Sequence, residues 1–152
     1  MAHFDSLDKN KQVLVLIHGL GSRKENWIPQ LPLKRYFRLI AIDLRGHGED
    51  LNSDDINMKS FTRDIAKLLH SKGINEAHFL GHSLGGAVAQ QMAIDYPNMV
   101  KSLILANTTS YFPDCIVSNT VKELDKNLNT FTDEQFIDGI CQRGLYNKEL
   151  AI

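Results

Sequence analysis

Four apolar runs along the chain constrain its fold more than any other feature. Each run is closed by glycine or polar residues, and a longer segment of mixed character follows it. Continuous apolar runs without alternation are typical of strands buried on both faces of a parallel sheet. Strands that alternate with helix-length segments are joined by right-handed crossovers. The sequence therefore predicts an α/β fold with an open, mostly parallel sheet and flanking helices. The predicted strands are residues 13–19, 37–48, 77–83 and 100–108.

Between the runs the apolar spacing changes to three and four residues, which indicates amphipathic helices. One helix is predicted by Met58, Phe61, Ile65, Leu68 and Leu69. Asn57 is its expected N-cap, and Gly73 follows its expected end. A second helix is predicted over residues 84–96 and halted by Pro97. A shorter helix is expected around residues 25–28, limited by its prolines. After Pro113, residues 115–129 and 133–144 look helical, and no further strand is expected.

Composition excludes several classes of partner. The 152 residues carry a formal net charge of -1, and their basic residues are scattered, so no nucleic acid partner is expected. No apolar run reaches the roughly 18 residues of a membrane helix, and the polar start does not resemble a signal peptide, so the expected location is cytoplasmic. Cys115 and Cys141 lie far apart, which favours reduced thiols over a zinc site or a disulfide.

Residues 79–90, FLGHSLGGAVAQ, contain the strongest chemical signal. The pattern Gly81-His82-Ser83-Leu84-Gly85 lies between a predicted buried strand and a predicted helix, which is the context that gives a GxSxG motif its meaning. Ser83 is expected on a sharp, strained turn at the carboxyl end of its strand, with its hydroxyl presented to a ligand. The alternative is an ordinary loop serine between glycines. The flanking strand and helix favour the nucleophile.

The sequence HGLG, residues 18–21, supports this interpretation. Acyl transfer by serine creates an oxyanion that needs fixed hydrogen-bond donors. One donor would be the backbone N–H of Leu84, and the other would be that of Leu20, with Gly21 as the neighbouring candidate. Alone, HGLG would be interpreted as a plain turn after a strand. Together with the GxSxG motif, it predicts an oxyanion hole.

The sequence DLRGHG, residues 43–48, is interpreted as structural. We expect Asp43 and Arg45 to bind backbone groups or each other, and the glycines to form a tight turn. A role for His47 as a catalytic base is disfavoured, because nothing in the sequence places it beside Ser83.

At these motifs the chain resembles the α/β-hydrolase fold family, within its esterase, lipase, enol-lactonase, haloperoxidase and C–C hydrolase group. The resemblance implies that Ser83 is the nucleophile and that the N–H groups of Leu20 and Leu84 form the oxyanion hole. It implies a core over residues 1–112 and the start of a helical cap or lid over residues 113–152. Ser83 separates the chain from dehalogenases and epoxide hydrolases of this fold, which keep aspartate at the elbow. No metal or organic cofactor is implied.

The acid and the base of the catalytic triad are missing from the expected positions. The family order is serine, acid, histidine, whereas all six histidines here precede Ser83. Asp114 follows the last strand but is better explained as a turn residue, and substitution by His18 is disfavoured. We therefore expect a truncated or fragmentary chain that is inactive alone, because serine needs a base to react.

The sequence thus predicts a serine hydrolase acting on a small ester, lactone or related acyl substrate. The alternative is a noncatalytic ligand-binding protein, or an assembly half-domain derived from a hydrolase. The strand at 100–108 would be an open apolar edge. That edge predicts self-association or pairing with a complementing C-terminal fragment.

Overall fold

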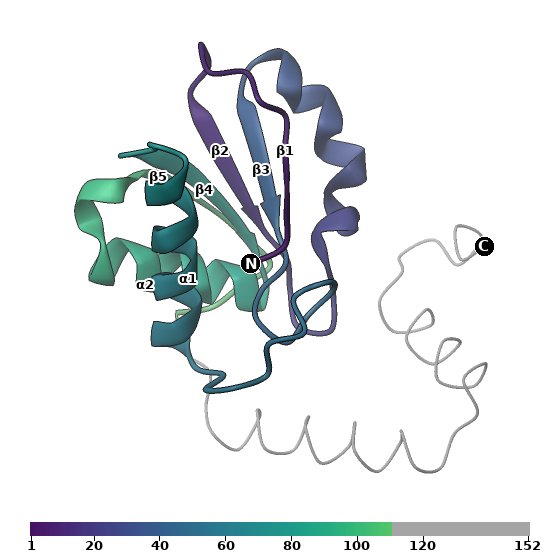
Figure 1. Ribbon diagram of the computed structural model, residues 1–152, viewed down its shortest axis with the longest axis vertical. Coiled ribbons are helices and arrows are strands. Elements are labelled where there is room, and N and C mark those ends of the chain that lie inside the picture. Colours follow the sequence, from purple (N-terminus) through teal and green to yellow (C-terminus); the bar gives the residue numbers. More distant parts are fainter. Residues whose placement is uncertain (111–152) are drawn as a thin grey trace, which may run out of the picture. The chain divides into compact units, whose positions relative to one another are not determined.

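The apolar runs form strands of one sheet in the computed structural model, which describes residues 1–110. The sheet has five strands in the order β1-β3-β2-β4-β5 (Figure 1). The strands are β1 (His3–Asp5), β2 (Val13–Ile17), β3 (Arg38–Ile42), β4 (Ala77–His82) and β5 (Val100–Ala106). The last four are parallel. The predicted open, mostly parallel α/β fold is confirmed.

Strand β1 was not predicted. It is three residues long and pairs antiparallel with β3, placing His3 opposite Ile42 and Asp5 opposite Ile40. Three residues are too few to show a strand period in the sequence. The Asp5 carboxylate accepts bonds from the Arg38 guanidinium at 2.9 and 2.7 Å, which ties β1 to the start of β3.

The register aligns the carboxyl ends of the central strands. Ile17, the last residue of β2, pairs with Ile42, the last residue of β3, and with Gly81 in β4. At the end of β5, Ala106 pairs with His82. Loops that follow these strands therefore emerge at one edge of the sheet, where ligands of α/β proteins bind.

Helix α1 (Met58–Ser71) begins and ends where the sequence predicts. Asn57 caps it in a capping box with Ser60, whose N–H donates to the Asn57 Oδ1 at 2.9 Å. Gly73, at φ +69°, follows the end, and the Ile74 N–H donates to the Leu69 carbonyl at 2.9 Å. This is a Schellman termination, which satisfies the last carbonyls of the helix.

Helix α2 (Leu84–Asp95) also confirms its prediction and ends just before the short 3₁₀ helix η2 (Pro97–Met99). The expectation of a short helix limited by prolines is wrong. Residues Lys24–Arg35 form the 3₁₀ helix η1, which contains Pro29 and Pro32. The fixed φ of proline suits successive 3₁₀ turns, so neither ring ends the helix.

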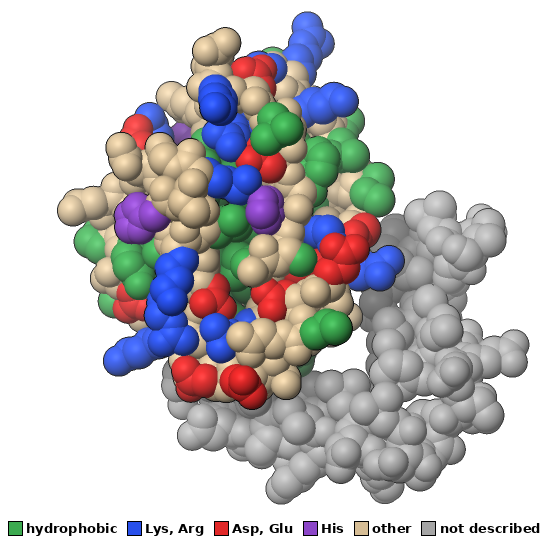
Figure 2. Space-filling model, in the orientation of Figure 1, with side chains coloured by type: hydrophobic (Ala, Val, Ile, Leu, Met, Phe, Trp, Pro, Cys, Tyr) green, Lys and Arg blue, Asp and Glu red, His purple; other side chains and the backbone are tan. Residues whose placement is uncertain are grey.

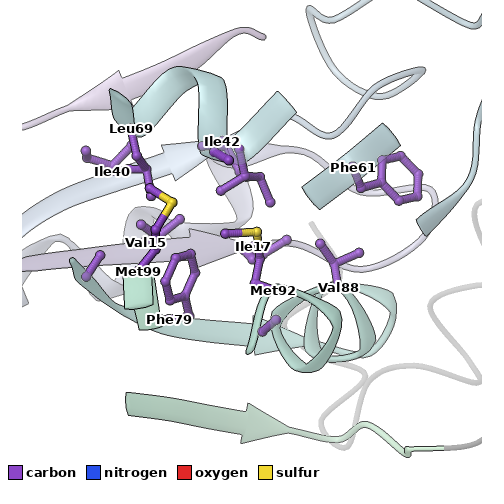
Figure 3. Close-up of a cluster of buried hydrophobic side chains, with 14 of the residues drawn as sticks. Val15, Ile17, Ile40, Ile42, Phe61, Leu69, Phe79, Val88, Met92 and Met99 are labelled. Atoms are coloured by element: carbon purple, nitrogen blue, oxygen red, sulfur yellow. The ribbon is translucent and has the colours of Figure 1, made fainter. Parts of the chain in front are cut away.

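The sheet is covered on both faces. Helices α1 and α2 pack on one face, where Ile17 and Ile42 of the sheet meet Phe61, Val88 and Met92 of the helices (Figure 3). On the other face η1 covers a smaller cluster of Leu14, Leu16, Trp27, Leu39 and Ala41. Strands β2 and β3 are buried at every residue, which explains their continuous apolar runs.

The second side of β5 has no partner strand within residues 1–110, where β5 pairs only with β4. Its Ile104 and Leu105 are 47% and 45% exposed. Within the same residues, no helix combines the length and apolarity needed to cross a membrane. The helices predicted at 115–129 and 133–144, the cap at 113–152, Asp114, Cys115 and Cys141 lie outside the described residues.

Candidate active site

Ser83 occupies the turn between β4 and α2, in a backbone conformation that side chains rarely adopt. Its φ is 52° and its ψ is −118°. A non-glycine residue in this region carries roughly 1–3 kcal/mol of strain and persists only where the surrounding structure enforces it. The strained turn that the GxSxG motif predicts is present.

Gly81 and Gly85 make this turn sterically possible. A Cβ on Gly81 would collide with the backbone of Gly85 and would lie 2.6 Å from the Cα of Gly86. A Cβ on Gly85 would collide with the carbonyl oxygens of Ile17 and His18. The first turn of α2 therefore packs directly on the ends of β4 and β2, which places Ser83 at the positive end of the helix dipole.

The end of β5 holds the turn from the other side. The Ser83 N–H donates to the Ala106 carbonyl at 3.0 Å, and the Thr108 hydroxyl donates to the Ser83 carbonyl at 2.7 Å. The same carbonyl accepts the Gly86 N–H at 2.9 Å. Both peptide groups of the strained residue are thus bonded. Sequence reasoning missed Thr108, because no local pattern links residues 83 and 108.

The HGLG loop lies beside Ser83. A Cβ built on Gly19 would be 3.2 Å from the Cβ of Ser83, so the loop and Ser83 are in contact range. Among the described residues, the backbone N–H groups of Leu20 and Leu84 have no hydrogen-bond partner. Both N–H groups are therefore free to donate, which a role in an oxyanion hole would require of them.

His18 holds the HGLG loop in place. The side chain is 1% exposed; its Nδ1 donates to the Gly19 carbonyl at 2.7 Å, and its Nε2 accepts the Leu44 N–H at 3.1 Å. A carbonyl can only accept and an amide can only donate, so this pair of bonds fixes the neutral Nδ1–H tautomer. Burial lowers the pKa of His18, with a smaller contribution from the neighbouring His47. Both ring nitrogens are occupied, so His18 is not available as a base for Ser83.

Asp43 joins the loops that follow β2 and β3. It is 0% exposed and accepts the Lys24 N–H at 2.7 Å, the Lys24 ammonium at 2.9 Å and the Glu49 N–H at 3.0 Å. Burial by itself would raise the pKa of Asp43, but the bonds from Glu49 and Lys24 outweigh burial and lower it. The carboxylate therefore anchors Lys24, at the start of η1, to the segment that follows β3.

Arg45 has a similar structural role. Its guanidinium donates to the Asp64 carboxylate at 2.9 and 3.0 Å and to the Asp54 carbonyl at 2.7 Å. The expectation that Asp43 and Arg45 bind backbone groups is confirmed, whereas they do not bind each other. The fold supplies Lys24 and Asp64 as their side-chain partners.

The structure brings Ser83 together with the loop of Leu20 but not with a base. Within residues 1–110 the Ser83 hydroxyl has no hydrogen-bond partner. His47 lies against His18, with ring centroids 5.1 Å apart, and its Nδ1 is 3.1 Å from the Arg45 carbonyl. His82 is exposed on the strand before the turn. The same residues contain no cluster of histidine, cysteine or carboxylate side chains that could hold a metal ion.

Comparisons with known proteins agree with this geometry. A family model described as alpha/beta hydrolase fold matches residues 12–142. Human epoxide hydrolase 4 is 34% identical over 104 residues, which are 66% of this chain and 29% of that protein. Two solved structures, a hydrolase from Pseudomonas aeruginosa and an esterase from a marine microorganism, give TM-scores of 0.80 and 0.79, each at 26% identity. These matches cover 98% and 99% of this chain but only 60% of each solved chain. The chain belongs to the alpha/beta hydrolase fold family.

Proposed function

We propose that Ser83 is the nucleophile of a serine hydrolase that acts on an ester, a lactone or a related acyl compound. The observation that carries this proposal is the conformation of Ser83, at φ 52° and ψ −118°, on the turn between a buried strand and the start of a helix. Backbone strain of this kind clusters at functional sites. The similarity to a solved esterase supports the acyl class of substrate.

The reaction follows from the groups around Ser83. The Ser83 oxygen attacks the acyl carbon, the carbonyl electron pair moves onto its oxygen, and the N–H groups of Leu20 and Leu84 donate to this oxyanion. A base takes the proton of the Ser83 hydroxyl during this attack and gives it to the departing alcohol, so collapse of the intermediate expels the alcohol and leaves an acyl-serine. Attack by water on the acyl-serine then releases the carboxylic acid and restores the hydroxyl.

We further propose that the acid and the histidine base are supplied by residues outside this chain, which alone is nearly inert. All six histidines precede Ser83 in the sequence, and both nitrogens of the nearest buried one, His18, are already bonded. Loss of triad members lowers turnover by roughly 10⁴- to 10⁶-fold. The coverage of 60% of the solved relatives is in keeping with this proposal.

A thiol at position 83 tests the site without the missing base, because a thiolate attacks acyl groups unaided. In a Cys115→Ser, Cys141→Ser background, the Ser83→Cys variant should release one equivalent of p-nitrophenolate from p-nitrophenyl acetate and then stop. The oxyanion donors and the helix dipole should make this acylation at least about tenfold faster than at an ordinary exposed thiol.

The matched control is Ser71→Cys in the same background, at the exposed end of α1. Equal rates of acylation at the two positions would show that the surroundings of residue 83 do not accelerate acyl transfer. A Ser83→Cys variant with no burst would also contradict the proposal. Catalytic turnover beyond one equivalent would show that the 152 residues contain their own base for deacylation.

A second candidate function, an assembly half-domain that pairs with a complementing polypeptide, is favoured by β5. Its outer edge has no partner strand among the described residues, and it exposes Ile104 and Leu105. Unpaired apolar edges bind further strands. Such a partner would also be a source of the acid and the histidine.

A further inference from the structure

A basic groove lies at the end of the sheet opposite Ser83. Its volume is about 410 Å³, and it runs past the first residues of β2, β3 and β4, namely Val13, Arg38 and Ala77. Glu76 is the sole acidic residue that lines it. Figure 2 shows lysine and arginine side chains gathered over this upper end of the sheet, where the strands begin. The cations that line the groove are Lys9, Lys11, Arg38, Lys72 and Lys101.

Two of these cations share one buried carboxylate. Arg38 Nη2 and Lys72 Nζ lie 2.7 and 2.9 Å from the same oxygen of Asp5, whose side chain is 5% exposed. The Arg38 side chain is itself only 8% exposed, and its Nη1 has no partner among the described residues. One positive charge of this triad therefore stays uncompensated, at a site where low exposure weakens screening by water.

The other cations add a second excess charge. Lys11 pairs with Asp8 at 2.9 Å, and Lys101 pairs with Glu76 at 3.0 Å. Lys9 makes no ion pair within residues 1–110. Five cations against three carboxylates leave about two positive charges on this groove, although the whole chain has a net charge of -1.

The floor of the groove also offers neutral donors. The backbone N–H groups of Asn75 and Glu76 have no hydrogen-bond partner among the described residues. Two carbonyls at the end of α1 already accept the N–H groups of Gly73 and Ile74. They therefore repel an anion less strongly than free carbonyls would, and they leave the N–H groups of Asn75 and Glu76 available. The groove is therefore rich in both positive charge and free donors.

We propose that this groove binds a small soluble anion that carries two or more negative charges on phosphate groups. Phosphate oxygens accept several bonds at once and match the planar donors of arginine. The volume lies within the range of small-molecule sites. Ser83 lies at the opposite ends of the same strands, so this site is separate from the proposed hydrolytic reaction and independent of it.

The test is calorimetric titration of the full 152-residue chain with inorganic pyrophosphate. The groove variant combines Lys9→Gln with Lys101→Gln, and the matched control combines Lys59→Gln with Lys67→Gln, two exposed lysines of α1 outside the groove. We expect saturable one-to-one binding that is roughly tenfold weaker in the groove variant and unchanged in the control.

Three results would overturn the proposal. They are absence of pyrophosphate binding to the wild-type chain, equal weakening in the groove variant and the control, and binding only to vesicles containing phosphatidylserine. The vesicle arm separates a soluble phosphate ligand from a lipid headgroup. A circular dichroism spectrum that is unchanged in both variants ensures that any loss of binding reflects the charges and not unfolding.

Discussion

Replacing the strained serine by glycine should make the chain more stable. Ser83 has φ 52° and ψ −118°, a conformation that costs a residue with a Cβ roughly 1–3 kcal/mol and costs glycine nothing. The Ser83→Gly variant removes that strain. It also gives the unfolded chain more conformational freedom, which lowers the free energy of unfolding by roughly 0.4–1 kcal/mol. Combining the two ranges gives an expected net gain of roughly 0–2.5 kcal/mol in the free energy of unfolding, with a central value of about 1.3 kcal/mol.

Ser83→Ala is the matched control, because it keeps the Cβ and removes only the hydroxyl. Since that hydroxyl has no partner among the described residues, the free energy of unfolding should change by less than about 0.5 kcal/mol. Urea unfolding can be followed by the fluorescence of Trp27, the single tryptophan, which is 9% exposed in the folded chain. A Ser83→Gly variant no more stable than Ser83→Ala would refute the assignment of strain to this turn.

Three further predictions concern packing, pH and assembly. Gly81→Ala should lower the free energy of unfolding by about 3 kcal/mol or more, because its Cβ meets the backbone of Gly85 and Gly86. Gly21→Ala, at φ +69° but in open space, should cost only about 1–2 kcal/mol, and equal losses in urea unfolding would contradict the packing argument. Burial lowers the pKa of His18 from 6.5, so its contribution to stability should be complete above about pH 6.5 and decline as pH falls through the folded value. The urea midpoint should follow this decline, and an identical slope in a His18→Gln variant would exclude His18 as its source. The wild-type chain should self-associate through β5, and Ile104→Lys with Leu105→Lys should shift sedimentation toward monomer, whereas Ile94→Lys on α2, 72% exposed, should not. A monomeric wild type, or the same distribution in all three proteins, would contradict that role of β5.

The sequence predicts the central fold well because each signal reflects a local physical requirement. Strands β2 and β3 are fully buried, so their apolar runs are continuous. The start of α1 is encoded by the capping box of Asn57 and Ser60, and its end by Gly73. Gly81 is needed by its contact with Gly85 and Gly86, a few residues along the chain. Local requirements of this kind leave a readable pattern.

Features that depend on distant residues leave no such pattern. Strand β1 is tied to the sheet by Asp5 and Arg38, which are 33 residues apart. Thr108 holds the Ser83 carbonyl across 25 residues, and Asp43 is bound by Lys24 across 19. The basic groove is the clearest case, because its cations are scattered along the sequence and only the fold gathers them. The net charge of a sequence therefore does not reveal an excess of positive charge at one site of the folded protein.

The most direct test of the account is the pH dependence of Ser83 phosphonylation in the wild-type 152-residue chain. A fluorophosphonate should label Ser83 slowly, as mapped by mass spectrometry, and Ser83→Ala should abolish the label. Without a histidine base, the rate should rise about tenfold per pH unit between about pH 6 and 9, with no plateau. Labelling at another residue would contradict Ser83 as the nucleophile. An inflection near the pKa of about 6.5 that is typical of histidine would contradict the proposal that the base lies outside this chain.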